Sequence, residues 1–296
     1  MKTALSCFTE AIFAYHEQSF ETAYQQTKQA ASIEPESLFY QQAELFLRHV
    51  SEKKSSDVYA SPEGFAEFIR GGGNVPLYQN TSAALHQIYT NSGASTLLDI
   101  GVGDGHALLP ALSDTIRQLD CVEPSVAMLT ALEKKLSDYD LQFQLHPLSW
   151  QDFRDGLESD RHWDMIQMTF SAHTFLPAER IDLMSWCAQR CKQLIVVEFD
   201  VSSFEKMMTA EVIRYYVEKY ELGLAEYTDK EVVMQNFLMP VFFGNFAHDS
   251  QRLTFEQPAD KWRRLLEQAD FADIQQAAIY DYWWGPAFML QAKGHG

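Results

Sequence analysis

A strand-like segment that runs into three evenly spaced glycines constrains this 296-residue chain more than any other feature. The stretch Leu97–Leu112 reads LLDIGVGDGHALLPAL, and an acid, Asp99, stands near the strand end. The glycines that follow are Gly101, Gly103 and Gly105. Glycines at this spacing let the backbone turn tightly against a ligand. We expect a helix over 105–112, whose first N–H groups would face that ligand.

Strands and helices alternate from this segment onward. Five short, mostly apolar runs are expected to be strands: Thr96–Ile100, Leu119–Glu123, Leu141–His146, Trp163–Thr169 and Gln193–Phe199. Helices are expected over Ser125–Leu136, Ala178–Gln189 and Pro258–Ala269. Strands separated by helices predict a parallel sheet with both faces covered. Two more β-like runs, 273–280 and 287–292, are joined by a short link and predict an antiparallel pair at the sheet edge.

The remaining segments read as helical additions to this sheet. In the first 50 residues, small and apolar residues follow one another at the offsets of a tetratricopeptide-like hairpin: Phe20, Ala23, Thr27, Ala30 and Pro35. One such unit is too few for an array, so it either packs on the main domain or docks a peptide. The polar stretch 51–57 is expected to be a linker, and Ser61 to cap a helix. We expect a helical region over 1–75 and a sheet domain over 76–296, with a cap insertion at about 205–257.

Charge and apolar patterning exclude several classes of protein. Lys and Arg total 23 against 41 Asp and Glu, a net charge of −18. Such a field disfavours nucleic acids and anionic membranes as partners. The first ten residues lack a signal-peptide pattern, and no stretch reads as a membrane span, so we expect a cytoplasmic protein. The four cysteines have no disulfide-framework spacing: Cys7, Cys121, Cys187 and Cys191. Cys187 and Cys191 stand four apart, which would suit a metal clip, but no His or Cys pair with ligand spacing lies nearby, so core thiols and no metal are expected.

The glycine pattern points to one cofactor family. It is not the dinucleotide fingerprint, which would need a glycine where this chain has His106. It resembles motif I, Asp-x-Gly-x-Gly-x-Gly, of the class I S-adenosylmethionine-dependent methyltransferases, and all four defined positions match. The resemblance implies the Rossmann-like seven-stranded methyltransferase sheet, mostly parallel with an antiparallel terminal strand. It also implies S-adenosylmethionine as the cofactor, bound at Asp99, Gly101 and Gly103.

The ends of the following strands agree with this resemblance. Glu123 ends the second strand, where the family carries the acid that accepts both ribose hydroxyls. By resemblance, one of four residues after the third strand contacts adenine: Ser149, Trp150, Gln151 or Asp152. Trp150 is alternatively a core aromatic residue, and Asp152 a helix cap. Thr169 ends the fourth strand, where the methyl group of the cofactor meets the acceptor in the family, and is a candidate cofactor-binding residue by this resemblance. The glycines 71–73 either end a helix or hinge a lid that brings Tyr78 to the cofactor.

Later segments resemble the GRAS-domain family, which shares the methyltransferase fold. The likeness covers residues 60–293 and is carried by Val-Val-Glu, a Tyr-Tyr pair and a Trp-Arg helix: Val196, Val197, Glu198, Phe204, Tyr215, Tyr216, Trp262, Arg263, Ala269 and Phe271. Bacterial members resemble small-molecule methyltransferases, and plant members are regulators that often lack an intact glycine motif. Because this chain keeps the motif, the resemblance favours a working cofactor site.

Transfer of a methyl group requires a base only when the acceptor must lose a proton. His173 follows the fourth strand and is the candidate general base, or else a hydrogen-bonded loop residue. Glu198, Tyr216, Phe242 and Trp283 are candidates for substrate contacts, with a structural role as the alternative for each. We therefore expect a methyltransferase for a small molecule. The alternative is a GRAS-like cofactor-binding regulator without methyl transfer. The aromatic insertion either covers a pocket or joins two subunits of a homodimer.

Overall fold

The chain divides into two compact units. The computed structural model describes residues 2–53, 61–157, 160–248 and 254–296. A sheet unit comprises Pro76–Ser203 and Leu253–Gly296, and a helical unit comprises Met1–Val75 and Phe204–Arg252. Most of the predicted linker at 51–57 lies outside the described residues, and residues 51–53 end a helix.

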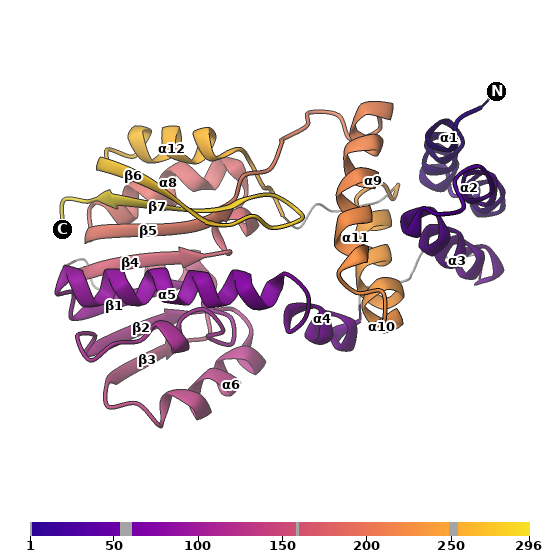
Figure 1. The fold of residues 1–296 in the computed structure, drawn as a ribbon. Helices are drawn as coiled ribbons and strands as arrows, with labels where there is room; N and C mark the ends of the chain where they lie inside the picture. Colours follow the sequence, from indigo (N-terminus) through magenta and orange to yellow (C-terminus); the bar gives the residue numbers. More distant parts are fainter. Residues whose placement is uncertain (1, 54–60, 158–159, 249–253) are drawn as a thin grey trace. The chain divides into compact units, whose positions relative to one another are not determined.

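The sheet unit is built on seven strands in the order β3-β2-β1-β4-β5-β7-β6 (Figure 1). Their bounds are β1 Thr96–Ile100, β2 Gln118–Val122, β3 Gln142–His146, β4 Trp163–Thr169, β5 Cys191–Phe199, β6 Ala272–Tyr280 and β7 Ala287–Lys293. The first five strands run parallel, and β7 runs antiparallel to both β5 and β6. The predicted seven-stranded, mostly parallel sheet with an antiparallel pair at one edge is confirmed.

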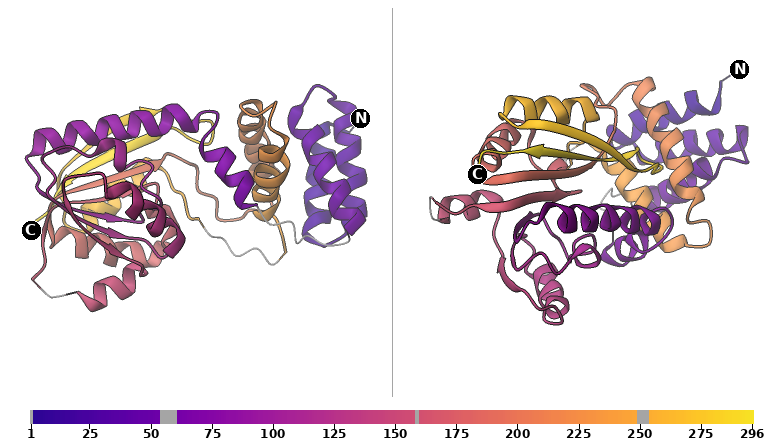
Figure 2. Two further views of the ribbon diagram at one scale, coloured as in Figure 1. Left: turned by 90° about the horizontal axis from the view of Figure 1, so that it is seen from below. Right: turned by 60° about the vertical axis from the view of Figure 1, so that its left-hand side comes forward.

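Helices cover both faces of this sheet because successive apolar side chains of its inner strands point to opposite faces. Leu97 faces the helices α5 (Asn74–Ser92) and α6 (Val126–Leu136), whose side chains share its core. Leu98, the next residue, belongs to the opposite core. That core is formed with α7, α8 and α12, which span Trp150–Gly156, Pro177–Ala188 and Ala259–Gln268. Figure 2 shows α5 lying along one side of the sheet.

Three predicted helices of the sheet unit, α6, α8 and α12, begin and end within one residue of expectation. The helix expected over 105–112 is wrong. Turns follow the glycines, and the segment then contains only a short 3-10 helix, η1 (Leu109–Ala111). Gly105 has a φ of +78°, outside the helical region, and Pro110 has no N–H with which to continue a helix. The glycines therefore lie in a loop of turns and not at the N-terminus of the expected helix.

The helical unit contains two separate parts of the chain. Its helices are α1 Ala4–His16, α2 Phe20–Ile33, α3 Leu38–Lys53, α4 Pro62–Ile69, α9 Ala210–Ala225, α10 Glu231–Val233, the π-helical η3 Met234–Leu238 and α11 Met239–Gly244. Ser61 caps α4 as predicted, accepting a hydrogen bond from the Gly64 N–H at 2.9 Å. In α2, Ala23, Thr27 and Ala30 are fully buried.

We expect residues 205–257 to form a cap of the sheet domain, but the structure groups most of them with the N-terminal helices. The physical reason is a shared aromatic core. Phe39 of α3 contacts Phe8 of α1 and Phe242 of α11, with ring centroids 5.1 and 4.8 Å apart. Phe46 of α3 and Phe243 of α11 are stacked at 4.7 Å. Aromatic pairs of this kind bury a large apolar area, so the inserted helices complete a core that the N-terminal helices begin.

Glu221 of α9 fastens the insertion to α3. Its two carboxylate oxygens accept hydrogen bonds from the N–H groups of Leu38 and Phe39, both at 2.9 Å, and from the Ser37 hydroxyl at 2.7 Å. A carboxylate at a helix N-terminus satisfies N–H groups that have no partner within the helix. Glu221→Ala is expected to lower the free energy of unfolding by about 2 kcal/mol. Urea denaturation measures this, with the exposed Glu218→Ala on the same helix as control. Equal stability of the two variants would contradict the capping role.

Candidate cofactor and catalytic site

The glycine loop after β1 packs directly against the end of β4. Gly101 has a φ of +77°, and a Cβ there would lie 2.5 Å from the Cβ of Ser171. The Ser171 hydroxyl donates to the Ile100 carbonyl at 2.6 Å, and the Gly101 N–H donates to the Val122 carbonyl at 2.7 Å. Only glycine fits this conformation and this close approach. The loop is therefore held between the ends of β2 and β4, at the carboxyl edge of the sheet.

Glu123 links the glycine loop to the helix after β2. One carboxylate oxygen accepts from the Gly103 N–H at 3.2 Å and the other from the Ser125 N–H at 2.9 Å. A carboxylate offers about four acceptor positions, so this arrangement leaves capacity for hydroxyl donors. The structure brings three predicted cofactor residues, Gly101, Gly103 and Glu123, to one edge of the sheet.

Asp99 is buried in the sheet beside this loop, with 2% of its surface exposed. Its Oδ2 accepts a hydrogen bond from Gln167 Nε2 at 2.6 Å, whereas Oδ1 is buried and has no hydrogen-bond partner in the described part of the chain. Burial raises the pKa of Asp99 to about 7. The Gln167 hydrogen bond works against this shift, and the nearby charge of Glu123 adds to it. A buried carboxyl oxygen without a donor is a place where a ligand donor would bind.

This raised pKa makes folding depend on pH. At pH values below about 3, Asp99 is neutral in both the folded and the unfolded state, so its burial does not change the pH dependence of the free energy of unfolding. As the pH rises toward 7, Asp99 ionises freely only in the unfolded state. The free energy of unfolding therefore falls by on the order of 4 kcal/mol. Asparagine at this position cannot ionise. The free energy of unfolding of Asp99→Asn minus that of wild type should therefore rise by on the order of 4 kcal/mol between pH 4 and pH 8. Urea titrations of both proteins at several pH values measure the difference, and parallel pH curves would contradict it.

The residues predicted near adenine have different environments. The Ser149 hydroxyl caps α7, accepting from the Asp152 N–H at 3.1 Å and donating to its carboxylate at 2.6 Å. Trp150 is 4% exposed and packs edge-on against Trp186, 4.8 Å away, in the core under the sheet. Trp150 therefore has the environment of the alternative prediction, a core aromatic residue. At the end of β4, Thr169 has a buried Oγ1 without a hydrogen-bond partner among the described residues.

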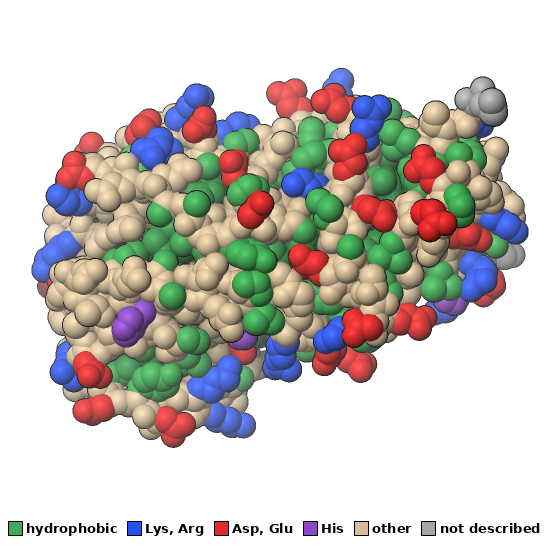
Figure 3. Space-filling view, in the orientation of Figure 1, with side chains coloured by type: hydrophobic (Ala, Val, Ile, Leu, Met, Phe, Trp, Pro, Cys, Tyr) green, Lys and Arg blue, Asp and Glu red, His purple; other side chains and the backbone are tan. Residues whose placement is uncertain are grey.

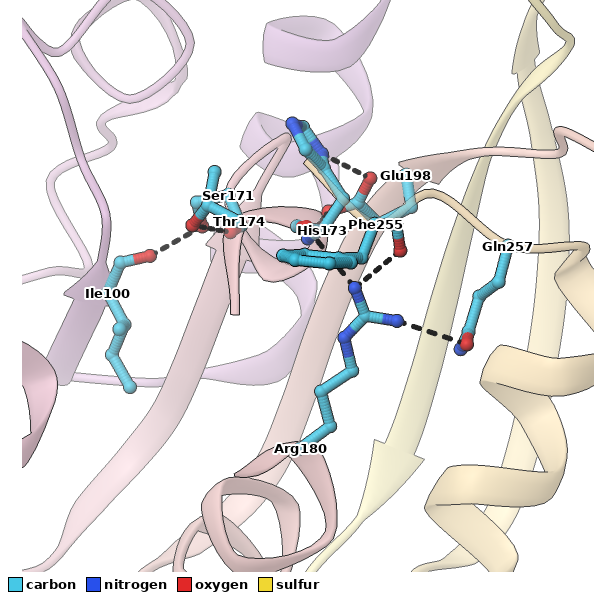
Figure 4. A network of polar contacts seen from close by, with 8 residues as sticks. All are labelled: Ile100, Ser171, His173, Thr174, Arg180, Glu198, Phe255 and Gln257. Atoms are coloured by element: carbon cyan, nitrogen blue, oxygen red, sulfur yellow. Dashed lines mark hydrogen bonds and ion pairs between the residues drawn. The ribbon is translucent and has the colours of Figure 1, made fainter. Parts of the chain in front are cut away.

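His173 and Glu198 form a close pair at the carboxyl ends of β4 and β5. Nδ1 of His173 lies 2.9 Å from Glu198 Oε2, and the backbone N–H of His173 donates to Oε1 at 3.0 Å. Figure 4 shows the second ring nitrogen pointing away from Glu198. Glu198 is 1% exposed, whereas the His173 side chain is 14% exposed. Burial alone lowers the pKa of His173, but the facing carboxylate outweighs it and the pKa is raised above its ordinary value.

Arg180, which is 1% exposed, fixes the backbone of this pair (Figure 4). Its guanidinium donates to the carbonyls of His173 and Phe255 and to the side chain of Gln257. The Phe255 N–H also donates to the His173 carbonyl at 2.7 Å. These bonds tie the short turn after β4 to the segment before α12, so the imidazole is carried by a rigid turn. The buried Arg180 was not predicted from the sequence.

A row of aromatic rings runs along the same edge of the sheet. Phe170, with a φ of +52°, stacks on Phe199 at 4.7 Å, and Phe199 stacks on Tyr282 at 5.4 Å. Tyr78 of α5 contacts Phe170 at one end, and Trp283 contacts Tyr282 at the other. Tyr78 and Trp283, predicted for the cofactor and substrate, thus belong to one row. Phe170 and Phe199 were missed, and their position at the ends of apolar strands was the available signal.

Two predicted substrate residues pack elsewhere, in the core of the helical unit. Phe242 is fully buried and Tyr216 is 6% exposed. Both contact Phe246, at 5.3 and 5.4 Å between ring centroids. The structure gives Phe242 and Tyr216 the core role that was their alternative, because the insertion uses its aromatic side chains to join the N-terminal helices.

Surface and composition add four observations. On the face drawn in Figure 3, Lys and Arg side chains are dispersed among Asp and Glu and form no basic patch. Within the described ranges, no group of three or more His, Cys, Asp or Glu side chains is arranged to hold a metal ion. Among the helices that the structure describes, none has the length and apolar character needed to cross a bilayer. The four cysteines are buried free thiols.

Comparison with known proteins identifies the fold. No protein-family model and no curated protein matches the sequence. Magnesium protoporphyrin IX methyltransferase from Synechocystis PCC 6803 matches in two solved structures, each with a TM-score of 0.50. The one with bound SAM is 12% identical and covers 81% of this chain and 95% of that chain. The one with bound SAH is 14% identical and covers 75% and 85%.

An O-methyltransferase family protein from Burkholderia thailandensis also matches, with a TM-score of 0.49 and 14% identity. The match covers 74% of this chain and 57% of that protein, so this chain spans little more than half of its length. At these identities the comparisons establish the fold. The chain has the Rossmann-like methyltransferase fold, with an additional helical unit.

Proposed function

We propose that the protein transfers a methyl group from S-adenosylmethionine to a small-molecule acceptor. The observation that carries this proposal is the pair of acids beside the glycine loop, Asp99 in β1 and Glu123 after β2, on a sheet of methyltransferase topology. The solved structures of this topology that contain bound SAM or SAH support it.

The residues present fit this cofactor. Glu123 keeps acceptor capacity for the two ribose hydroxyls, and the positive-φ glycines allow a close backbone approach. Asp99 Oδ1 and Thr169 Oγ1 are buried oxygens without partners among the described residues, and they suit the donors of an amino-acid moiety. We keep Tyr78 of α5 as a candidate cofactor contact, because its ring lies against Phe170, the residue after β4. Bound S-adenosylmethionine would supply an electrophilic methyl group on a sulfonium.

The protein's own part in the reaction is to position the acceptor and to take its proton. We assign this proton to Nε2 of His173, because Nδ1 faces Glu198 and the second nitrogen points away from it. Glu198 orients the imidazole and stabilises its protonated form. The aromatic row from Tyr78 to Trp283 favours a planar acceptor, which stacks on such rings. A phenolic or enolic hydroxyl would meet both requirements.

Glu198→Gln tests the pair through the pH dependence of turnover. Only neutral His173 accepts a proton, so wild-type kcat should rise with pH through an apparent pKa above 6.5. Glutamine still accepts a hydrogen bond from the His173 N–H but carries no charge, so the apparent pKa should fall. The measurement is kcat against pH with saturating substrates. An unchanged profile in the variant would contradict the role of Glu198.

The activity itself is tested by incubating the protein with S-adenosylmethionine and small phenols, enols and amines, and measuring S-adenosylhomocysteine formation. Acceptor-dependent formation supports the proposal. Binding of S-adenosylmethionine without turnover of any acceptor would favour the alternative, a GRAS-like cofactor-binding regulator. The GRAS resemblance, the homodimer and the cytoplasmic location stay predictions from the sequence.

A further inference from the structure

Three buried polar side chains form a chain of hydrogen bonds beneath the glycine loop. Tyr89 of α5 and Gln167 in the middle of β4 are fully buried, and Asp99 is 2% exposed. The Tyr89 hydroxyl bonds to Gln167 Oε1, and Gln167 Nε2 donates to Asp99 Oδ2 at 2.6 Å. A polar side chain in the core costs free energy unless it is hydrogen-bonded, and an apolar residue would pack there without that requirement. Two such residues behind Asp99 therefore indicate a role other than packing.

The order of bonds fixes the direction of the amide. Because the Tyr89 hydroxyl donates to the amide oxygen, the amide NH2 group must face Asp99. With the amide reversed, its oxygen would face a carboxylate oxygen, and the two acceptors would repel. Tyr89 thus acts on Asp99 through Gln167, and Asp99 Oδ2 is bound before any ligand arrives.

The second oxygen of Asp99 is left for a ligand. Oδ1 is buried and has no hydrogen-bond partner among the residues that the structure describes. Thr169 Oγ1 shares this property, and Thr169 lies roughly 7 Å farther along the same face of β4 than Gln167. Two unpartnered oxygens near the carboxyl end of the sheet suit a donor with several hydrogens. The ammonium group of an amino acid is such a donor, and its positive charge complements a carboxylate.

We propose that Tyr89 and Gln167 are positioning residues of the cofactor site, which hold one oxygen of Asp99 so that the other binds the ammonium group of the cofactor's amino-acid portion. This inference rests on the proposed function, since it requires S-adenosylmethionine or its product to bind. Tyr89 and Gln167 contact no ligand themselves in this proposal, and they act on the ligand through Asp99.

The test compares two ligands that differ in the amino-acid portion. Calorimetry with S-adenosylhomocysteine and with 5′-methylthioadenosine, which lacks that portion, is performed on wild type, Tyr89→Phe and Gln167→Met. Each variant should raise the Kd of S-adenosylhomocysteine roughly tenfold or more and change the Kd of methylthioadenosine by less than about twofold. The double variant should bind no more weakly than Gln167→Met, because Tyr89 acts through Gln167.

The matched control is Thr81→Val on the same helix, whose buried hydroxyl donates only to the Leu77 carbonyl of that helix. It should change neither Kd. Equal losses for both ligands, no loss for either, or additive losses in the double variant would each overturn the positioning role. If Gln167→Met does not fold, Tyr89→Phe alone decides through the two-ligand comparison. A wild-type protein that binds neither ligand would instead overturn the proposed function.

Discussion

Glu123→Ala is expected to weaken the binding of S-adenosylmethionine at least about a hundredfold. The carboxylate already binds the Gly103 and Ser125 N–H groups, so it is held at the glycine loop with its remaining acceptor positions available. Each hydrogen bond from a hydroxyl to a charged group contributes about 1.5–3 kcal/mol, and a ribose offers two. Removing both therefore costs roughly 3–6 kcal/mol of binding free energy.

Calorimetric titration of the variant with S-adenosylmethionine measures this loss. The control is Glu133→Ala, which removes the same charge from an exposed position on α6, the helix after Glu123. The control should bind as wild type does, which separates the ribose contact from the change in net charge. Equal affinities of Glu123→Ala and wild type would show that this acid does not contact the cofactor.

His173→Asn is expected to lower kcat roughly a hundred- to ten-thousandfold, the range typical of a general base. The asparagine amide can still donate to Glu198, so the buried carboxylate keeps a partner, but the amide cannot take a proton. The Kd of S-adenosylmethionine should be unchanged, since the proposal assigns the imidazole to the acceptor and not to the cofactor. Steady-state kinetics and calorimetry on the same preparation measure both quantities.

The exposed His162→Ala is the control for this experiment, and it should retain wild-type kcat. A His173→Asn variant with undiminished kcat would contradict the base assignment. A variant that loses cofactor affinity as well as turnover would place His173 at the cofactor instead of the acceptor.

The sheet and its edge residues were the part most accessible to sequence analysis. Strand segments such as Trp163–Thr169 are short apolar runs between helical patterns, and the sheet confirms that the first five strands run parallel. Local pattern also located Asp99, Glu123 and His173 at strand ends. The closeness of His173 and Glu198 could not be read from the sequence. It depends on the register in which Thr169 pairs with Val197, which places Glu198, the next residue of β5, beside the turn that follows β4.

The missed features are those that tertiary packing decides. Gln167 is a polar residue within an apolar strand, and that anomaly was the one available signal of the hydrogen-bonded chain to Asp99. The four-residue spacing of Val212, Tyr216 and Tyr220 indicates a buried helix face but not which core the face joins. Pro110 locally prevents the helix expected after the glycines, a conflict between the family pattern and the residue itself.

The most direct test of the central claim is calorimetry of the unmodified protein with S-adenosylmethionine and with S-adenosylhomocysteine. The account predicts saturable binding of both ligands with one site per chain. It further predicts competition between them, because both occupy the glycine loop between Asp99 and Glu123. Absence of binding by either ligand would contradict the account, since this edge of the sheet would then not be a cofactor site.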